Sequence, residues 1–418
     1  MSAPTLETPG TPAGNERKST EQPHQNRLIS ELLSSSVTTT VLAIVLSMLI
    51  GGLLIAFTAP EVVDALGYFF QRPGDTFAAV WDAVAGGYAA LFRGSIFNYE
   101  APTFLRAIKP LSDTLNFATP LIMAGLGVGL AFRVGLFNIG GRGQMLMGSA
   151  AAGFVMFGLD LPLLLHLPLV VIAGIAGGAI WGGIVGFLKA RTGAHEVILT
   201  IMLNFVAFYF VAWLLSTPGL LMRPGGNQPI SPVTPESAKF PLLFGAPLTT
   251  HWGFIAALLA ALFVWWLMER SSLGFRMRAV GENPHAARAS GIKVERIIFY
   301  AMAIAGGLAG LAGANQVAGT ITTGFGSHID AGIGFDAITV ALLGRSRAWG
   351  VVAAGLLFGA LKAGSFTMQI NEGIPVDIVL VVQALIVLFI AAPPLVRTVF
   401  GLKRFDRVRA LQQKGASA

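Results

Sequence analysis

The feature that most constrains the fold of this chain is a succession of apolar runs, several of them about 20 residues long. An α-helix of that length spans the hydrocarbon core of a bilayer, because each residue adds about 1.5 Å. Hydrophobic residues make up 54% of the chain and charged residues only 12%, which excludes an ordinary soluble domain. About ten apolar segments follow one another, at 37–57, 115–132, 145–159, 164–188, 197–215, 254–268, 297–317, 333–343, 351–368 and 376–396. The sequence therefore predicts an all-α membrane protein with about ten transmembrane helices, of which 333–343 is short or broken.

Charged residues orient these helices. Loop 269–296 and the tail 397–418 are rich in Lys and Arg, so the positive-inside rule predicts that both are cytoplasmic. The loops 58–110 and 217–251 carry few basic residues for their length and are predicted to lie outside, with an amphipathic stretch at 75–92 on the outer interface. The net charge of +7 is thus interpreted as a topology signal and not as a surface for nucleic acid.

Composition separates the ends of the chain from its apolar middle. Residues 1–35 are polar and rich in Pro, Thr, Glu and Gln, which predicts a disordered cytoplasmic tail. Residues 36–396 form the transmembrane domain, and 397–418 form a basic cytoplasmic tail. The sequence predicts a multi-pass protein of the inner cell membrane with both termini in the cytoplasm.

A glycine-rich segment, Leu136–Gly148, interrupts the apolar pattern with three glycines in four positions. Such a composition disfavours a helix and predicts a broken or re-entrant segment. Unwound backbone at membrane depth is tolerated where protein buries it or where it lines a water-filled cavity, and transporters place binding sites in such breaks. The alternative is a short interfacial turn in which the glycines serve only flexibility.

Amides beside this break are the candidate substrate contacts. Asn138 and Gln144 flank the glycines, and Asn204 lies within a later apolar run. Phe137 and Phe335 neighbour polar residues and offer rings on which a base can stack. Amides together with aromatic rings suit a neutral polar solute such as a nucleoside. The alternative is that each amide bonds a neighbouring helix and each ring only packs.

The basic loop 269–296 contains signals for a short helix. Asn283 is a favourable N-cap, Pro284 occupies the first helical position, and Gly291 is placed to end the helix. Isolated helices of two turns are marginal in water, so this one needs a partner. Either it docks on a cytoplasmic protein, with small Ala286 and Ala287 permitting close approach, or it lies on the membrane surface.

Several chemistries lack the residues they require. The chain has no cysteine, no G-x-x-x-x-G-K-[ST] phosphate loop and no H-E-x-x-H pair, so no catalytic residue, metal site or bound cofactor is expected. An ion-coupled carrier is the alternative from another class, since carriers use ionisable residues within the membrane. The candidate relays are few, however, and Glu196, Asp336 and Asp377 all fall near predicted interfaces.

Four segments together resemble permease subunits of ATP-binding-cassette (ABC) importers for nucleosides and related simple sugars, within the branched-chain amino acid and simple sugar permease superfamily. Residues 136–144 read LFNIGGRGQ and are similar to the FNIG-x-x-GQ motif, and residues 195–204 read HEVILTIMLN, similar to the EVI-x-T-x-MLN segment. Residues 273–292 resemble the cytoplasmic coupling loop, and residues 334–344 read GFDAITVALLG, similar to the GFD-x-I-x-VALLG segment. The resemblance covers roughly residues 105–396.

The resemblance implies a subunit that forms the translocation pathway while a separate ATPase subunit hydrolyses ATP. It implies further partners, namely a second permease subunit in a heterodimer, an extracytoplasmic substrate-binding protein, a small-molecule substrate and membrane lipid. The residues of the coupling loop that it points to are Gly281, Asn283, Pro284, Ala286, Ala287 and Gly291.

The chain departs from the family pattern at two positions. Arg142 stands where an acidic residue is common, and His195 stands where Asn is common. Both changes are expected to alter local pairing or substrate preference. A ribose-type sugar permease is the alternative within the same family.

Overall fold

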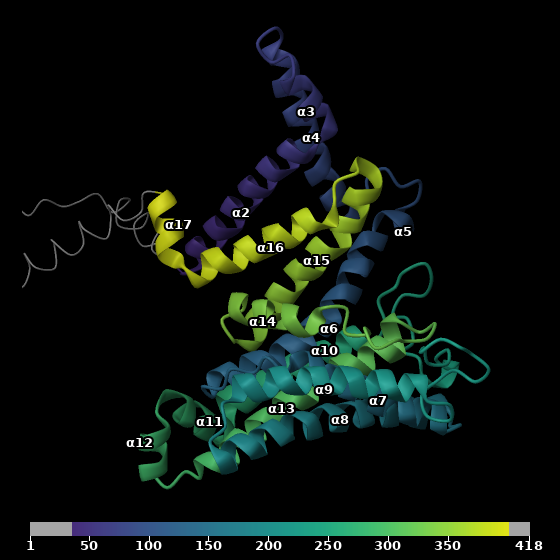
Figure 1. The fold of residues 1–418 in the computed structure, drawn as a ribbon, viewed down its shortest axis with the longest axis vertical. Coiled ribbons are helices and arrows are strands. Elements are labelled where there is room, and N and C mark those ends of the chain that lie inside the picture. Colours follow the sequence, from purple (N-terminus) through teal and green to yellow (C-terminus); the bar gives the residue numbers. More distant parts are fainter. Residues whose placement is uncertain (1–35, 401–418) are drawn as a thin grey trace, which may run out of the picture. The chain divides into compact units, whose positions relative to one another are not determined.

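The structure, a computed structural model, describes residues 36–400, which form helices and no strand (Figure 1). These residues divide into two compact units, Val45–Ala391 and a smaller one made of the residues before and after it. The smaller unit contributes the first turns of a long helix and one short helix. The predicted tails 1–35 and 401–418 lie outside the described residues.

The helices follow one another with short connections for most of the chain. In chain order they are α2 Ser36–Thr58, α3 Pro60–Leu66, α4 Pro73–Ser95, α5 Phe104–Ala107, α6 Lys109–Arg133, α7 Gly141–Gly158, α8 Leu163–Thr192, α9 Glu196–Ser216, η1 Glu236–Ala238, α10 Gly253–Arg270, α11 Ser272–Glu282, α12 Pro284–Ala289, α13 Val294–Asn315, η2 Gln316–Thr320, α14 Ile333–Leu343, α15 Ala348–Glu372, α16 Val376–Ala391 and α17 Pro393–Val399.

Seven described helices are long and apolar enough to cross a membrane. They are Thr40–Thr58, Phe104–Arg133, Leu163–Thr192, Glu196–Ser216, Gly253–Arg270, Val294–Thr320 and Ala348–Glu372. The other three predicted spans fall on α7, α14 and α16, and α14 and α16 are apolar but shorter. The prediction of a multi-pass, all-helical membrane protein is therefore confirmed, whereas the count of about ten crossings stays a prediction.

The core of the larger unit is built around α6. Residues 118–131 of this helix are all buried, so the helix is covered on every side. It packs against α15, where a side chain at Gly355 or Gly359 would collide with Ile122 or Ala118. Glycines thus bring the helices close enough for backbone contact, which is the usual packing mode inside membranes.

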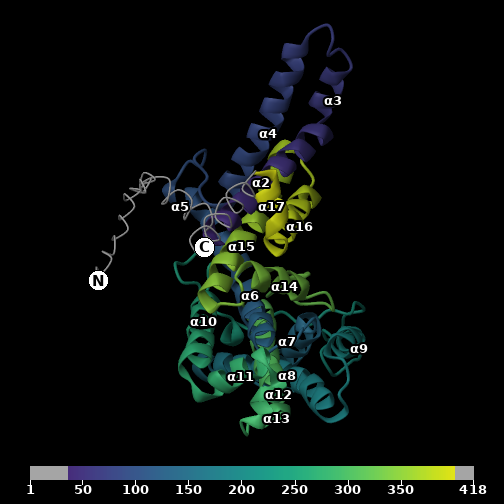
Figure 2. The same ribbon diagram turned by 90° about the vertical axis from the view of Figure 1, so that its left-hand side faces the viewer.

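A second packed group is formed by α7, α8 and α13, which lie side by side in Figures 1 and 2. A Cβ added at Gly178 of α8 would lie 2.2 Å from the carbonyl oxygen of Gly306 in α13, and the reverse holds for Gly306. A Cβ added at Gly148 of α7 would likewise lie 2.4 Å from the Cα of Gly310 in α13. No residue larger than glycine fits these crossings.

Two predicted boundaries are wrong. The break predicted within 136–148 is shorter than expected, because residues 134–140 are non-helical but α7 already begins at Gly141. The last predicted span, 376–396, is also too long, since α16 ends at Ala391. Pro393 and Pro394 follow, and a proline disfavours helical backbone in the residue before it.

A second non-helical segment within the larger unit lies at residues 321–332, between η2 and α14. Phe325, Ile329 and Asp330 are buried in it, although the backbone is not helical. Phe325 lies beside Gly153 of α7, whereas Asp330 reaches Arg142 near the start of the same helix. The segment therefore runs along α7 inside the protein, where unwound backbone is tolerated.

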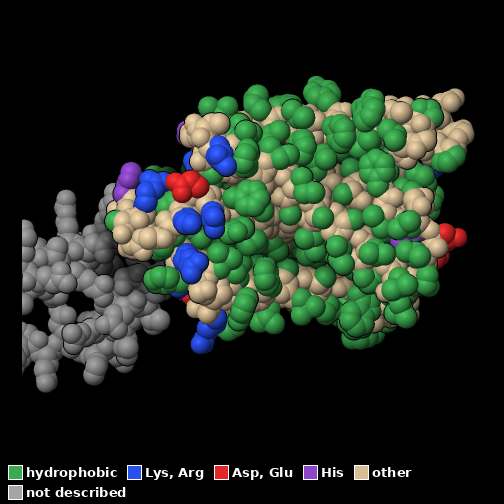
Figure 3. Space-filling view, turned by 90° about the horizontal axis from the view of Figure 1, so that it is seen from below, with side chains coloured by type: hydrophobic (Ala, Val, Ile, Leu, Met, Phe, Trp, Pro, Cys, Tyr) green, Lys and Arg blue, Asp and Glu red, His purple; other side chains and the backbone are tan. Residues whose placement is uncertain are grey.

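The helices of the larger unit end in two polar regions. The α12 end holds residues 134–140, 190–196 and 271–291, and the α5 end holds residues 96–109 and 217–252. Figure 3 shows Lys and Arg side chains gathered on the left, the side of α11 and α12 in Figure 1, while most of the rest of that face is hydrophobic. This distribution is expected of helices that cross a bilayer.

Candidate functional site

Asn138 and Gln144 face one another at the α12 end. The Asn138 Nδ2 donates to Gln144 Oε1 at 3.1 Å, and Gln144 Nε2 donates to Asn138 Oδ1 at 3.2 Å. Asn138 Oδ1 also accepts the N–H of Gly140 at 3.0 Å, which holds the connection against the first turn of α7. The pair therefore closes the non-helical connection on itself.

Asn204 ties α9 to the same connection. Its Oδ1 accepts the N–H of Gly143 at 2.8 Å, one of the donors left unpaired at the start of α7, and its Nδ2 donates to the carbonyl of Ile139 at 3.0 Å. The structure thus brings the three predicted amides into one cluster, the amide cluster, in which Asn138, Gln144 and Asn204 are 0%, 1% and 4% exposed. In this conformation their amide groups bond the protein itself.

The two predicted aromatic residues lie at the edge of the amide cluster. Phe137 is exposed and stacks on Phe132, with ring centroids 4.9 Å apart. Phe335 is exposed near the start of α14, one residue after Gly334, against which Gly141 packs. Both rings remain accessible, unlike the three amides.

Charged residues brace the same region from two sides. Lys189 at the end of α8 donates to Glu196 at 2.6 Å, and the N–H of Phe137 donates to the other oxygen of Glu196 at 3.4 Å. Arg142 lies 3.3 Å from Asp330 and over the ring of Phe208. At position 142 the chain thus pairs α7 with the segment 321–332, whereas His195 is an exposed side chain 3.9 Å from Glu196.

The capped helix of the basic loop forms as predicted, as α12. Asn283 Oδ1 accepts the N–H groups of His285 and Ala286 at 3.0 and 3.1 Å, Pro284 begins the helix, and Gly291 follows its end at φ +82°. Ala286 is exposed. Ala287 is 4% exposed, so it packs within the chain and the prediction that it permits a partner to approach is wrong.

Gly281 of α11 packs against the non-helical residues that join α6 to α7. A Cβ at Gly281 would lie 2.3 Å from the carbonyl oxygen of Arg133, and Gly135, at φ +76°, faces Gly281 in return. Arg133 and Arg278 both contact Glu269, at 2.7 and 3.6 Å. Contact thus runs without a gap from α11 to the residues that the amide cluster holds.

Sequence reasoning missed polar groups near the end of α13. There η2 forms a π-helix, a rare element that often marks functional sites. Both polar atoms of the buried Asn315 side chain, and the Oε1 of Gln316, have no partner in the described part of the chain. The signal was available, because glycines and threonines crowd 319–332 just after an apolar run. Among the described residues, no group of three or more metal-binding side chains occurs.

Comparisons with known proteins match this chain to membrane transport proteins. A family model described as branched-chain amino acid transport system / permease component matches residues 111–391. The guanosine ABC transporter permease protein NupP of Bacillus subtilis is 41% identical over 339 residues, covering 80% of this chain and 91% of that protein.

Two further relatives differ in the substrate that their names state. The nucleoside ABC transporter permease protein NupB of Lactococcus lactis is 35% identical over 77% of this chain and 91% of its own length. A glucose ABC transporter permease protein of Haloferax volcanii is 36% identical over 67% of this chain and 75% of its own length. No solved structure matches the chain.

Proposed function

The chain belongs to the branched-chain amino acid transport system / permease component family, and we propose that it is the membrane-spanning permease subunit of an ATP-driven ABC importer for nucleosides. The observation that carries the proposal is the 41% identity to a guanosine permease over 80% of this chain. The exposed rings of Phe137 and Phe335, close to a polar cluster, suit a base and a ribose better than a strongly charged solute. A glucose permease among the relatives keeps a simple sugar as the second candidate.

The proposed topology has ten crossings, made of the seven long helices together with α7, α14 and α16. The α12 end lies in the cytoplasm together with both termini, because Lys and Arg gather there. Residues 134–140 and 321–332 are the re-entrant or broken parts of the pathway, since both are non-helical and connect helices of the larger unit.

We propose that α12 is the element that contacts the ATPase subunit. It is short, capped and exposed, and it lies at the basic end of the molecule, so it fits a groove on an ATPase subunit. Motion of α12 reaches the pathway through α11, because Gly281 lies directly on the backbone of Arg133 and Gly135. In this proposal the partner subunit binds and hydrolyses ATP, and this chain requires no cofactor of its own.

For the amide cluster we propose a positioning role within the pathway. Asn138, Gln144 and Asn204 hold the connection 134–140 in place, and a substrate reaches them only when α11 shifts that connection. Phe137 and Phe335 are the groups of this region that a solute meets first, because their rings are exposed.

The complete importer contains more than this chain and its ATPase. We propose a second permease subunit, different from this one, and an extracytoplasmic binding protein that delivers the solute to the α5 end. The ion-coupled alternative is less well supported, because the carboxylate of Glu196, one of its few candidate relays, is already held by Lys189.

Uptake assays test the proposal. Cells with and without the gene are given radiolabelled guanosine, uridine or ribose, and the expected result is ATP-dependent nucleoside uptake that the deletion abolishes. Uptake of ribose alone would favour the sugar permease. Concentrative uptake by the purified chain alone, driven by a proton or sodium gradient in liposomes, would replace the proposal with a carrier.

A further inference from the structure

A cavity of about 440 Å³ lies at the α5 end, between α4, α5, α6 and α15. None of the residues predicted from the sequence lines it. Its volume falls within the range of small-molecule sites, roughly 300 to 1,000 Å³. The chemistry of its wall therefore decides what it accepts.

Charges on the wall are largely neutralised by the protein. Arg93 contacts the carboxylates of Glu100 and Glu372, and Lys109 donates to Asp113 at 2.8 Å. Arg106 on α5 is the remaining cation of the wall, and no described residue forms an ion pair with it. One exposed guanidinium does not make an anion site, so the wall suits a neutral solute.

Hydrogen-bonding groups remain open on the same wall. Asn116 uses its oxygen within the protein, accepting from His251 Nε2 at 3.1 Å and from the Thr320 hydroxyl at 3.3 Å. Its NH₂ group forms no hydrogen bond with the described residues, and Asn116 lines the cavity together with Thr367. A donor pair and a hydroxyl are what a carbonyl, a ring nitrogen or a ribose hydroxyl requires.

Two aromatic rings complete the wall. Phe117 of α6 and Phe366 of α15 stack with centroids 5.9 Å apart and planes 27° from parallel. Phe366 is exposed, so one face of this pair is available to a further flat ring. A ring face beside open hydrogen-bonding groups suits a solute that carries both a flat ring and polar groups, such as a nucleoside.

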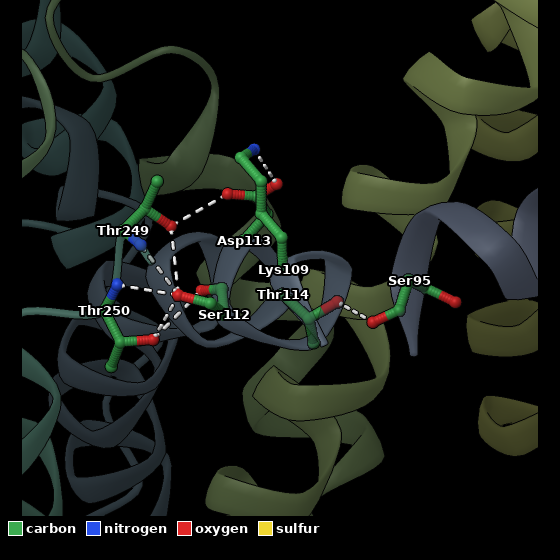
Figure 4. A network of polar contacts seen from close by, with 7 residues as sticks. All are labelled: Ser95, Lys109, Ser112, Asp113, Thr114, Thr249 and Thr250. Carbon is green, nitrogen blue, oxygen red and sulfur yellow. Dashed lines mark hydrogen bonds and ion pairs between the residues drawn. The ribbon is translucent and has the colours of Figure 1, made fainter. Parts of the chain in front are cut away.

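The opposite side of α6 is fixed, which keeps this wall in place. Figure 4 shows the Ser112 hydroxyl between Thr249 and Thr250, whose backbone N–H groups donate to it at 2.8 and 2.9 Å. The Thr114 hydroxyl donates to the carbonyl of Ser95 at 2.6 Å and binds α6 to the end of α4. Asp113 is held as well, because its carboxylate accepts from the Thr249 hydroxyl at 2.8 Å and from Lys109. Asn116 and Phe117 are therefore the residues of α6 that keep groups for a solute.

Helices α4 and α15 pack closely against each other beside the cavity. A Cβ at Gly94 would lie 2.3 Å from the Thr367 hydroxyl, and a Cβ at Gly364 would lie 2.5 Å from the carbonyl oxygen of Leu91. Helices α4, α5, α6 and α15 supply all of the lining except Asn98, which favours a defined geometry.

From this geometry we infer a nucleoside-binding site in the cavity between α4, α5, α6 and α15. The base stacks on Phe366, and the Asn116 amide and the Thr367 hydroxyl bond the polar edge of the solute. The inference rests on the proposed function, and it adds the place where the solute first contacts the permease. Because the Asn116 oxygen bonds Thr320, solute at this site also lies one hydrogen bond from the π-helix at the end of α13.

Single-cysteine labelling tests the site directly, because the native chain has no cysteine. The Thr367→Cys variant, assembled in the complete importer in proteoliposomes, is labelled with a membrane-impermeant maleimide with and without guanosine. Guanosine is expected to slow the labelling at least about fivefold, whereas glucose leaves it unchanged. The control is Val233→Cys, exposed in the loop 217–252 at the same end, whose labelling guanosine should not change.

A transport measurement adds a second readout with matched variants. Phe366→Leu is expected to raise the KM for guanosine about fivefold, because it removes a stacking partner. Phe154→Leu is the control, since Phe154 is 42% exposed and Phe366 is 45% exposed, but Phe154 does not line the cavity. Thr367→Val should raise the same KM and leave the Tm unchanged.

The outcomes separate this inference from the proposed function. Import of guanosine by the wild type, with unprotected Thr367→Cys and a normal KM for Phe366→Leu, overturns the site and leaves the function standing. Protection by glucose but not by guanosine overturns the nucleoside assignment. A wild-type complex that imports no nucleoside overturns the proposed function, and the inferred site with it.

Discussion

Polar side chains at the two ends of the larger unit are used in different ways. At the α12 end, Asn138, Gln144 and Asn204 are buried and bond one another or the adjacent backbone. At the α5 end, Asn116 bonds the protein with its oxygen only, and the Thr367 hydroxyl lines an open cavity. The comparison teaches that a buried amide in an apolar sequence can serve the fold alone, whereas an amide with unused hydrogen-bonding capacity beside a cavity is available to a solute.

The largest expected effect is a loss of stability when one member of the amide cluster is removed. Asn138→Leu leaves the Gln144 amide and the Gly140 N–H without partners. Each buried group left unpaired costs about 1–3 kcal/mol, so the free energy of unfolding is expected to fall by about 3 kcal/mol. Thermal unfolding of the purified protein, together with membrane abundance, measures the loss.

A double variant sharpens this test. Asn138→Leu combined with Gln144→Leu removes both partners at once, and such pairs are far less costly than the single changes, so part of the lost stability should return. Phe366→Leu at the α5 end is the control and should lower the Tm less than Asn138→Leu, because it removes one stacked ring pair and leaves no buried polar group unpaired. An unchanged Tm with abolished uptake in Asn138→Leu would place Asn138 in contact with the substrate and would break the comparison.

The second expected effect concerns the pH dependence of the α5 end. His251 is buried behind the cavity, with Asn116 on its Nε2 and the ring of Phe240 stacked on it, and burial lowers the pKa of His251 to about 4. The unfolded chain binds this proton at the ordinary pKa of about 6.5, so acid favours unfolding. The stabilisation is complete above pH 6.5 and is lost as the pH falls toward 4, by about 2 kcal/mol at pH 5.

Melting curves between pH 7.5 and pH 5 measure this dependence. His251→Gln keeps a neutral polar side chain but cannot take up a proton. The Tm of this variant is therefore expected to fall less than the wild-type Tm between pH 7.5 and pH 5. Parallel curves for the wild type and His251→Gln over the whole range would show that the proton of His251 is not linked to folding, and that the α5 end is held by its hydroxyl network alone.

The third effect, of about 1 kcal/mol, is confined to α12. Asn283→Ala removes the acceptor of two N–H groups at the start of the helix, and loss of a cap typically costs about that much. Hydrogen exchange of the amides of residues 285–289 should accelerate, whereas exchange around Ser112 and Thr250 stays as in the wild type. Faster exchange at both ends would mean that the two ends unfold together.

The same contrast explains what the sequence predicted and what it did not. The N-cap Asn283, Pro284 and the terminating Gly291 lie within nine positions of one another, so local rules identified α12 correctly. The apolar runs likewise predicted the long helices, because span length is set by the bilayer.

Contacts between distant residues were beyond such rules. Asn116 meets His251 across 135 positions and Thr320 across 204, and no pattern within a window of the sequence encodes either contact. Glycine content near 140 was interpreted as unwinding, yet Gly141 and Gly143 are helical because α14 and α9 pack directly on them. Tertiary packing decided where the glycines become helical, so that the break near 140 ends at residue 140 and a second non-helical segment lies at 321–332.

The smallest effect on the fold is expected at the exposed face of α12. Ala286→Trp adds bulk where the side chain faces outward, and exposed substitutions usually change stability by less than about 0.5 kcal/mol. If α12 enters a groove on the ATPase, this variant keeps its Tm and its guanosine protection of Thr367→Cys, but loses co-purification of the ATPase and ATP-driven uptake. Ala287 is unsuited to the test, because its side chain is buried and a tryptophan there disturbs the fold itself. Recovery of the ATPase at wild-type yield with intact uptake in Ala286→Trp would make α12 a connector, and the two ends would then differ only in how their polar side chains are bonded.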